Sequence, residues 1–269
     1  MKLSKKILML GLSMCLLTPT QSFAEKNVER ETVNQVALLQ SLAMGHFDGS
    51  ISVENLKKLG DIGIGTFDGL NGEMIFLDGV VYRADENCKI NVVADAETIP
   101  FSNVTFFDKD FSIQLQNISD KKNLENKLAE IVKTNGENSF YMIKLTAKFD
   151  EILVRSEKGA KKPYPTLVKA LETQKEKTLK NVEGTIVGLY CPEFMSSLNS
   201  VGWHFHFVTK DKKLGGHVLE MKIKTGVAEL DKTDNFSMIL PENKDFQDLN
   251  FAKDLSADIK KAENDTVSK

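Results

Sequence analysis

Three of the four histidines in this 269-residue chain, His204, His206 and His217, lie within fourteen residues of one another. Side chains two apart on a β-strand point to the same face, so His204 and His206 should project together. If the chain reverses at Asp211-Lys212, His206 and His217 become directly opposed, because each lies five residues outside that pair. The sequence therefore predicts a β-hairpin with three histidines gathered on one face.

This cluster has the composition of a metal site. Opposed residues of a hairpin have Cβ atoms about 4.5–5.5 Å apart, which lets two imidazoles share one ion. Three neutral imidazoles that leave a position open are typical of catalytic zinc, although such sites also accept other first-row ions. A loop from Lys210 to Gly216 longer than a tight turn, or a bulge at Gly215-Gly216, would change the register. A single histidine on an apolar strand would instead be an ordinary core or surface residue.

The first 24 residues are expected to be a secretory signal peptide. Three lysines precede an apolar run from Ile7 to Leu17, and Ser22-Phe23-Ala24 offers small residues for cleavage before Glu25. Cys15 resembles a lipoprotein signal only loosely. The run is too short to span a bilayer, so the mature protein is expected to be exported, periplasmic or secreted, without a membrane segment.

The charge of the chain bears on its possible partners, and its cysteine content bears on possible disulfides. Cleavage after Ala24 would remove three lysines and no acids, which moves the formal charge from −3 to −6. A mildly acidic domain argues against nucleic acid as a partner. Cys88 and Cys191 would remain, and the sequence leaves open whether they form a disulfide or two buried thiols.

The rest of the pattern predicts an α+β fold dominated by antiparallel hairpins. Asn71-Gly72 and Asp78-Gly79 are strong hairpin signals. Helices are expected at 32–44, 53–59, 120–133, 166–173 and 251–263. Strands are expected at 73–77, 80–83, 89–94, 102–107, 140–145, 151–155, 184–190, 202–209, 217–223 and 226–230. A division near Asn135 would give an N-terminal α+β subdomain, 25–135, and a C-terminal β-rich, metal-binding subdomain with a helical tail, 136–269.

Several segments together resemble the α-acetolactate decarboxylase family. They cover nearly all of the expected mature chain in the family's order: Gly60–Met74, Leu77–Gly79, Val104–Phe107, Gly184–Gly188, Gly202–Phe207 and Gly215–Val218. The resemblance implies two β-rich subdomains with mixed or antiparallel sheets, a homodimer and a Zn²⁺ cofactor. It also implies conversion of the small-molecule substrate (S)-2-acetolactate to (R)-acetoin and carbon dioxide, a step of acetoin biosynthesis in the butanediol pathway.

The resemblance also implies roles for individual residues. The expected zinc ligands are His204, His206 and His217, and the arginine that grips the substrate is Arg155. Two acids complete the family's site, matched by Glu73 and by Glu263, for which Asp258 is the competing choice. One carboxyl would protonate the enediolate left by decarboxylation, but the sequence does not assign which acid donates. Thr66 is a further candidate for a hydrogen bond to the substrate.

Two other functions fit parts of the pattern. Cupin-like oxygenases and isomerases also carry His-x-His on a hairpin, but typically with a carboxylate soon after it and a histidine on a later strand. Here the third histidine follows after eleven residues and none comes later. An exported, non-enzymatic zinc-binding protein would tend to have His-rich or acidic tracts, which this chain lacks.

Overall fold

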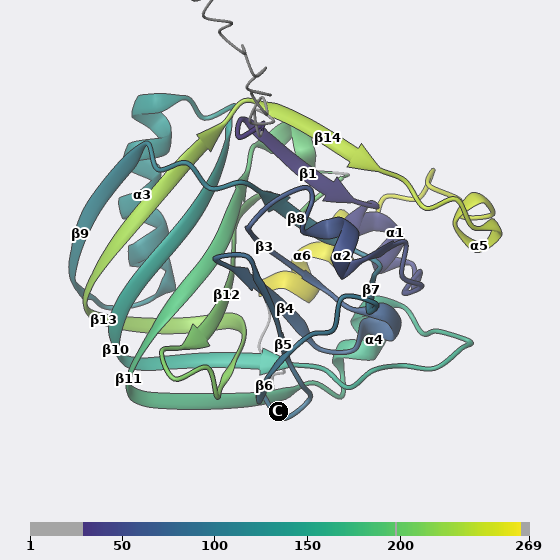
Figure 1. Cartoon of the computed structure of the whole chain (residues 1–269), viewed down its shortest axis with the longest axis horizontal. Helices are drawn as coiled ribbons and strands as arrows, with labels where there is room; N and C mark the ends of the chain where they lie inside the picture. The colour runs from purple at the N-terminus through teal and green to yellow at the C-terminus, as the bar shows by residue number, and fades with distance from the viewer. Residues whose placement is uncertain (1–28, 197, 265–269) are drawn as a thin grey trace, which may run out of the picture.

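The computed structural model describes residues 29–196 and 198–264, and it consists mostly of β-sheet with a few short helices (Figure 1). The strands are β1 (Thr32–Val36), β2 (Ile51–Ser52), β3 (Ile62–Thr66), β4 (Glu73–Leu77), β5 (Val80–Ala84), β6 (Ile90–Val92), β7 (Thr98–Ile99), β8 (Ser102–Thr105), β9 (Phe111–Ile118), β10 (Phe140–Ser156), β11 (Lys175–Cys191), β12 (Gly202–Thr209), β13 (Gly215–Thr233) and β14 (Asn235–Ile239). The helices are α1 (Leu39–Ala43), α2 (Val53–Leu56), α3 (Lys121–Asn135), α4 (Leu167–Leu171), α5 (Lys244–Gln247) and α6 (Ser256–Asn264), with 3-10 turns η1 (Asp68–Leu70) and η2 (Glu193–Met195). The expected signal peptide, with Cys15 and the cleavage point at Ala24, lies outside the described residues.

Two sheets form the body of the molecule. The first has seven strands in the order β14-β1-β8-β3-β4-β5-β6, and it is mixed because β1 runs parallel to β14. The second has five antiparallel strands in the order β10-β11-β12-β13-β9. A further pairing of β10 with β13 closes the second sheet on itself, so the strand that carries His217 also lies beside β10.

Apolar cores hold these layers together. One face of the seven-stranded sheet packs on the five-stranded sheet through residues such as Ile64, Ile75, Val187 and Leu189. A second core fills the five-stranded sheet and the inner face of α3, which lies on the left of Figure 1. A third cluster joins α1, α4 and α6, and α6 is drawn yellow near the middle of Figure 1. The two sheets and this helical cluster therefore meet in one region.

The chain passes between the layers more than once. Strand β9 and helix α3 precede residue 136 but belong to the five-stranded sheet and its core, whereas β14 near the C-terminus joins the seven-stranded sheet. The division into 25–135 and 136–269 stays a prediction. None of the helices between residues 29 and 264 is long and apolar enough to cross a membrane.

The helix expected at 32–44 is wrong over its first half. Residues 32–36 form β1, which pairs with β8 and β14, and the backbone turns at Ala37 with φ of 57° before α1 begins at Leu39. The spacing of Val33, Val36 and Leu39 fits one face of a helix, but β-branched residues also suit a strand buried between two neighbours. Pairing on both sides therefore decided the conformation.

Most other expected elements are confirmed, with two mergers. The Asn71-Gly72 and Asp78-Gly79 signals lie directly before β4 and between β4 and β5, and Asp120 caps α3 through its side chain. The strands expected at 140–145 and 151–155 form one strand, β10, which tolerates register shifts near Phe149 instead of ending. The strands expected at 217–223 and 226–230 likewise form β13. Cys88 and Cys191 are both free and buried.

One buried acid gives the fold a pH dependence. Asp231 on β13 is 1% exposed, and its carboxylate accepts hydrogen bonds from the Asp108 backbone N–H at 3.1 Å and the Thr233 hydroxyl at 3.4 Å. Burial, followed by repulsion from nearby acids such as Asp110, raises the pKa of Asp231 to about 7. An acid whose pKa is raised on folding contributes stability below its unfolded pKa and loses that contribution as pH rises towards the folded value.

We therefore expect Asp231→Asn to stabilise the protein at pH 8 and not at pH 4. The amide keeps an acceptor for Asp108 and removes a charge that is costly to bury, so the free energy of unfolding should rise by about 2 kcal/mol at pH 8. Urea denaturation at both pH values measures the difference. Asp234→Asn, at an exposed acid paired with Lys232, should give no gain at either pH. An equal effect of Asp231→Asn at pH 4 and pH 8 would contradict this account.

Candidate active site

The histidine hairpin has the predicted register. His206 pairs with His217, Phe207 with Gly216 and Val208 with Gly215, so no bulge interrupts the ladder here. The turn lies at Asp211-Lys212, where Lys212 adopts a φ of 56°. Along β12, Trp203, Phe205 and Phe207 enter the core of the five-stranded sheet, whereas His204 and His206 point to the other face. The period of two therefore places both imidazoles where the sheets meet.

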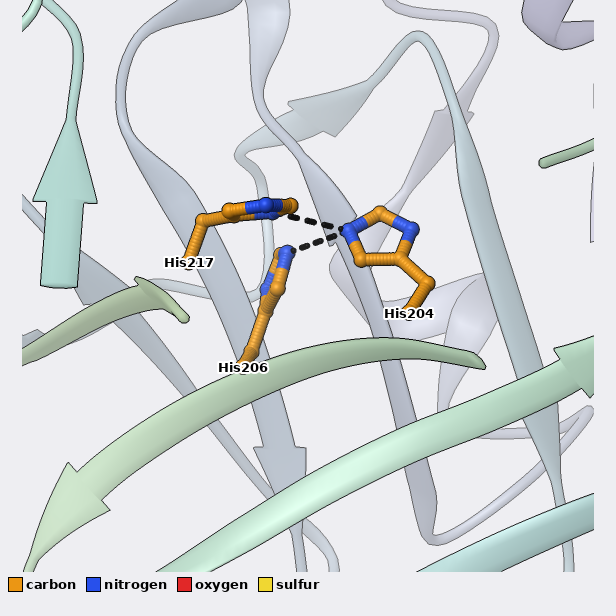
Figure 2. A group of neighbouring side chains, drawn as sticks. All are labelled: His204, His206 and His217. Carbon is orange, nitrogen blue, oxygen red and sulfur yellow. Dashed lines mark hydrogen bonds between the residues drawn. The ribbon is translucent and has the colours of Figure 1, made fainter. Parts of the chain in front are cut away.

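The three rings converge on a common point (Figure 2). His204 Nε2 lies 3.1 Å from His206 Nε2 and 3.0 Å from His217 Nδ1. One nitrogen from each ring lies within 4.8 Å of the others, which qualifies the group as a possible metal site. His206 and His217 are 1% and 2% exposed, so the rings meet away from bulk water.

Hydrogen bonds behind the rings fix their tautomers. His206 Nδ1–H donates to the Met74 carbonyl at 2.7 Å, and His217 Nε2–H donates to the Glu263 carbonyl at 3.0 Å. The opposite nitrogens, His206 Nε2 and His217 Nδ1, therefore carry lone pairs that face His204. Ligating histidines are commonly held in this way, by a second hydrogen bond to a carbonyl or carboxylate.

Burial keeps the imidazoles uncharged. It lowers the pKa of His204 to about 3 and that of His206 to about 4, and the neighbouring Arg155 lowers the pKa of His204 further. The pKa of His217 is lowered well below its ordinary value for the same two reasons. Neutral imidazole is the form that binds a metal, so the three rings are ready ligands at neutral pH.

Arg155 reaches this cluster through the pairing of β10 with β13, where it lies opposite His217. Gly216 makes that approach possible. Its φ is +150°, and a Cβ there would lie 2.4 Å from the Arg155 carbonyl oxygen. The Gly-Gly pair before His217 thus lets the hairpin lie against the strand that supplies the arginine.

Arg155 is 3% exposed and surrounded by acceptors. Its Nη2 donates to the Ala262 carbonyl on α6 at 2.9 Å. Its Nη1 lies 3.5 Å from Glu73 Oε1 and 3.8 Å from Glu157 Oε2, and its Nε has no hydrogen-bond partner among the described residues. The guanidinium is therefore anchored on one side and keeps an unused donor.

The two predicted acids come from opposite ends of the chain. Glu73 begins β4 and places Oε2 3.3 Å from His206 Nε2. Glu263, near the end of α6, places Oε2 3.2 Å from His204 Nε2. Burial is the main cause that raises the pKa of both carboxyls. The competing choice, Asp258, is exposed on the same helix.

One cavity joins these residues. Thr66, Glu73, Arg155, Glu263 and the three histidines all line it. The Thr66 hydroxyl donates to the Gly72 carbonyl at 2.8 Å, next to the turn that presents Glu73. The remaining wall is largely apolar and comes mainly from α1, η1 and α4: Leu39, Leu42, Leu70, Phe101, Leu167 and Leu171.

The cavity also contains an acid that sequence reasoning missed, Glu157, which is 2% exposed. Burial raises its pKa, whereas the Arg155 charge lowers it. Its spacing of two residues from Arg155 was the available signal, because such side chains share a face in extended backbone. Nothing local distinguished this glutamate from a solvated one.

A divalent cation fits this donor set. His204 Nε2 faces two imidazole lone pairs and the Glu263 carboxylate, and a single N–H can satisfy only one of these three acceptors. Glu263 Oε2 is buried and has no hydrogen-bond partner among the described residues. Nitrogen and carboxylate oxygen ligands around one point are a combination that zinc and similar ions accept.

Known proteins are similar to this chain in sequence and in fold. Residues 33–253 match the family model described as alpha-acetolactate decarboxylase. Proteins of that name from Methanosarcina mazei and Brevibacillus brevis are 37% and 33% identical to this chain, over 88% and 90% of it and 82% and 83% of their own lengths. The crystal structure of alpha-acetolactate decarboxylase from Bacillus subtilis strain 168 is similar, with a TM-score of 0.84 and 29% identity over 87% of this chain and 100% of that one. The chain therefore belongs to the alpha-acetolactate decarboxylase family.

Proposed function

We propose that this protein is a zinc-dependent decarboxylase that converts (S)-2-acetolactate to (R)-acetoin and carbon dioxide. Its family supports the reaction. The convergence of three neutral imidazoles beside a buried arginine and two buried acids supports the mechanism. This juxtaposition is the observation that carries the proposal.

His204, His206 and His217 would hold the ion, with the Glu73 and Glu263 carboxylates next to it. When bound, the ion supplies a Lewis acid for the negative charge that develops on the former ketone oxygen as carbon dioxide departs. The Met74 and Glu263 carbonyls keep two of the rings in the ligating tautomer.

Arg155 binds the substrate carboxylate in this proposal. A guanidinium keeps its charge at any working pH and presents a planar set of donors that suits a carboxylate. The Arg155 Nε–H has no partner among the described residues, and Arg155 lines the cavity, so a donor is left for the ligand. This contact would fix the conformation from which the carboxylate leaves.

A carboxyl then delivers the proton that acetoin requires. Loss of carbon dioxide leaves an electron pair on the carbon that carried the carboxylate, and a new C–H bond must form there. Glu73 and Glu263 are the acids nearest the histidines, so one of them, in its protonated form, would donate to that carbon. The apolar wall from α1 and α4 keeps bulk water from supplying that proton without stereochemical control.

Incubation of the zinc-loaded protein with racemic acetolactate tests the reaction. We expect acetoin and carbon dioxide in equal amounts, with (R)-acetoin in excess on chiral chromatography. Protein stripped by a chelator should lose this activity and regain it with zinc, and a buffer sample corrects for spontaneous decarboxylation. Acetoin formation no faster than in buffer would refute the proposed function.

A further inference from the structure

The proposed reaction leaves one buried acid of the cavity without a role. Glu157 lines the cavity, is 2% exposed, and keeps Oε2 without a hydrogen-bond partner among the described residues. Among the described residues, Glu157 forms its ion pair with Arg155, whose Nη1 lies 3.8 Å from Glu157 Oε2. A buried carboxylate is costly unless it is paired, so the position of Glu157 is tied to that arginine.

The donors of Arg155 show what this pairing does. Nη2 is used by the Ala262 carbonyl at 2.9 Å, and Nη1 lies between Glu73 Oε1 at 3.5 Å and Glu157 Oε2 at 3.8 Å. The Ala262 carbonyl thus accepts a hydrogen bond from Nη2, and two carboxylates lie at ion-pair distance from Nη1. The Nε–H is left over. Because the guanidinium is planar, fixing its two outer nitrogens also fixes the direction of Nε–H.

Glu73 alone would hold Nη1 differently. Glu73 also lies 3.3 Å from His206, so its carboxylate draws the arginine towards the imidazole cluster. Glu157 directly follows the end of β10, two residues beyond Arg155. It offers a second charge that forms no ion pair or hydrogen bond with the histidines among the described residues. The two acids together keep Nη1 between them.

We propose that Glu157 is a positioning residue, whose carboxylate holds the Arg155 guanidinium so that its free Nε–H faces the substrate carboxylate. The inference rests on the proposed function, in which Arg155 binds that carboxylate. Glu157 itself does not touch the substrate. It acts on the orientation of the group that does.

Three variants and two probes test this role. Glu157→Met keeps the volume without charge, and Glu157→Gln keeps an acceptor oxygen. Glu151→Gln changes a partly exposed glutamate of β10, the strand that ends just before Glu157, and Glu151 pairs with Lys180 and Lys222. Calorimetry on the zinc-loaded proteins measures the Kd of 2-hydroxy-2-methylpropanoate, which carries a carboxylate, and of acetoin, which does not. Zinc content and Tm are measured on every variant.

In Glu157→Met we expect the Kd of the hydroxy acid to rise about 10–30-fold and that of acetoin to change less than about twofold, because only the carboxylate uses Arg155. In Glu157→Gln the Kd of the hydroxy acid should rise about three- to fivefold, since the amide keeps a polar oxygen near Nη1 but loses the negative charge. Glu151→Gln should leave both values unchanged. Zinc content should stay constant throughout.

Two results would overturn the positioning role. Unchanged hydroxy-acid binding in Glu157→Met would make Glu157 a space-filling residue, because buried ion pairs are often replaced by apolar side chains without loss. An equal rise for both probes would indicate general damage to the cavity. If Glu157→Met does not fold, the Glu157→Gln comparison decides alone. These measurements need no turnover, so a failure of the wild-type protein to form acetoin would refute the decarboxylase proposal separately.

Discussion

Replacing His206 by alanine is expected to abolish zinc binding and acetoin formation together. His206 is the histidine paired with His217, and its Nε2 lies near both His204 Nε2 and Glu73 Oε2. Loss of one of three imidazole ligands removes the Lewis acid from the reaction. A Lewis acid contributes several kcal/mol, so kcat/KM should fall by about 10³-fold or more. Elemental analysis of the purified variant and the acetoin assay measure the two losses.

His46→Gln is the matched control for this experiment. His46 is the remaining histidine, 4% exposed, and its Nε2 lies 3.0 Å from Asn243 Oδ1, outside the cavity lining. Glutamine keeps a polar group for that contact, so zinc content and activity should match the wild type. Full activity in a zinc-free His206→Ala protein would contradict metal dependence. A wild-type zinc content in the same variant would contradict the ligand assignment.

Arg155→Ala is expected to keep zinc and lose turnover. The guanidinium is not a metal ligand, but it is the cation that anchors the substrate carboxylate in the proposed function. Hydrogen bonds to charged groups contribute about 1.5–3 kcal/mol each, which corresponds to a fall in kcat/KM of about 10–10²-fold for one such bond. Steady-state kinetics and elemental analysis on the same preparation measure both quantities.

Two further variants separate this role from a structural one. Removing a buried arginine leaves Glu73 and Glu157 without their shared cation, so Tm should also fall. Arg155→Lys restores the charge without the planar donors and should recover more Tm than activity. Arg83→Ala, which breaks an ion pair with Glu97 outside the cavity lining, should keep activity. Normal turnover in Arg155→Ala would exclude Arg155 from substrate binding.

Local sequence rules were sufficient to predict the histidine cluster. The period of two along β12, together with a turn at Asp211-Lys212, determines that His204, His206 and His217 share one face, because the turn type and loop length fix the register of a hairpin. The cap at Asp120 and the Asn-Gly and Asp-Gly turns could also be predicted, because they too depend on residues close together in the sequence. The segment at 32–44 was not readable, because strands β8 and β14, distant in the sequence, decided that residues 32–36 extend.

The rest of the site depends on contacts between distant segments. Glu73, Arg155 and Glu263 could be singled out beforehand only through resemblance to a family, and the spacing of Glu157 from Arg155 did not distinguish it from a solvated glutamate. Periodicity gives the face on which each of these side chains lies but not the layer that will cover it. Three contacts bury the side chains of Glu73, Arg155, Glu157 and Glu263 around one point. Strand β10 pairs with β13, β4 packs behind His206, and α6 packs against His217. The amino-acid sequence alone therefore determined the histidine hairpin, whereas only the tertiary structure decided which charges surround it, because burial and charge pairing arise where separate elements pack together.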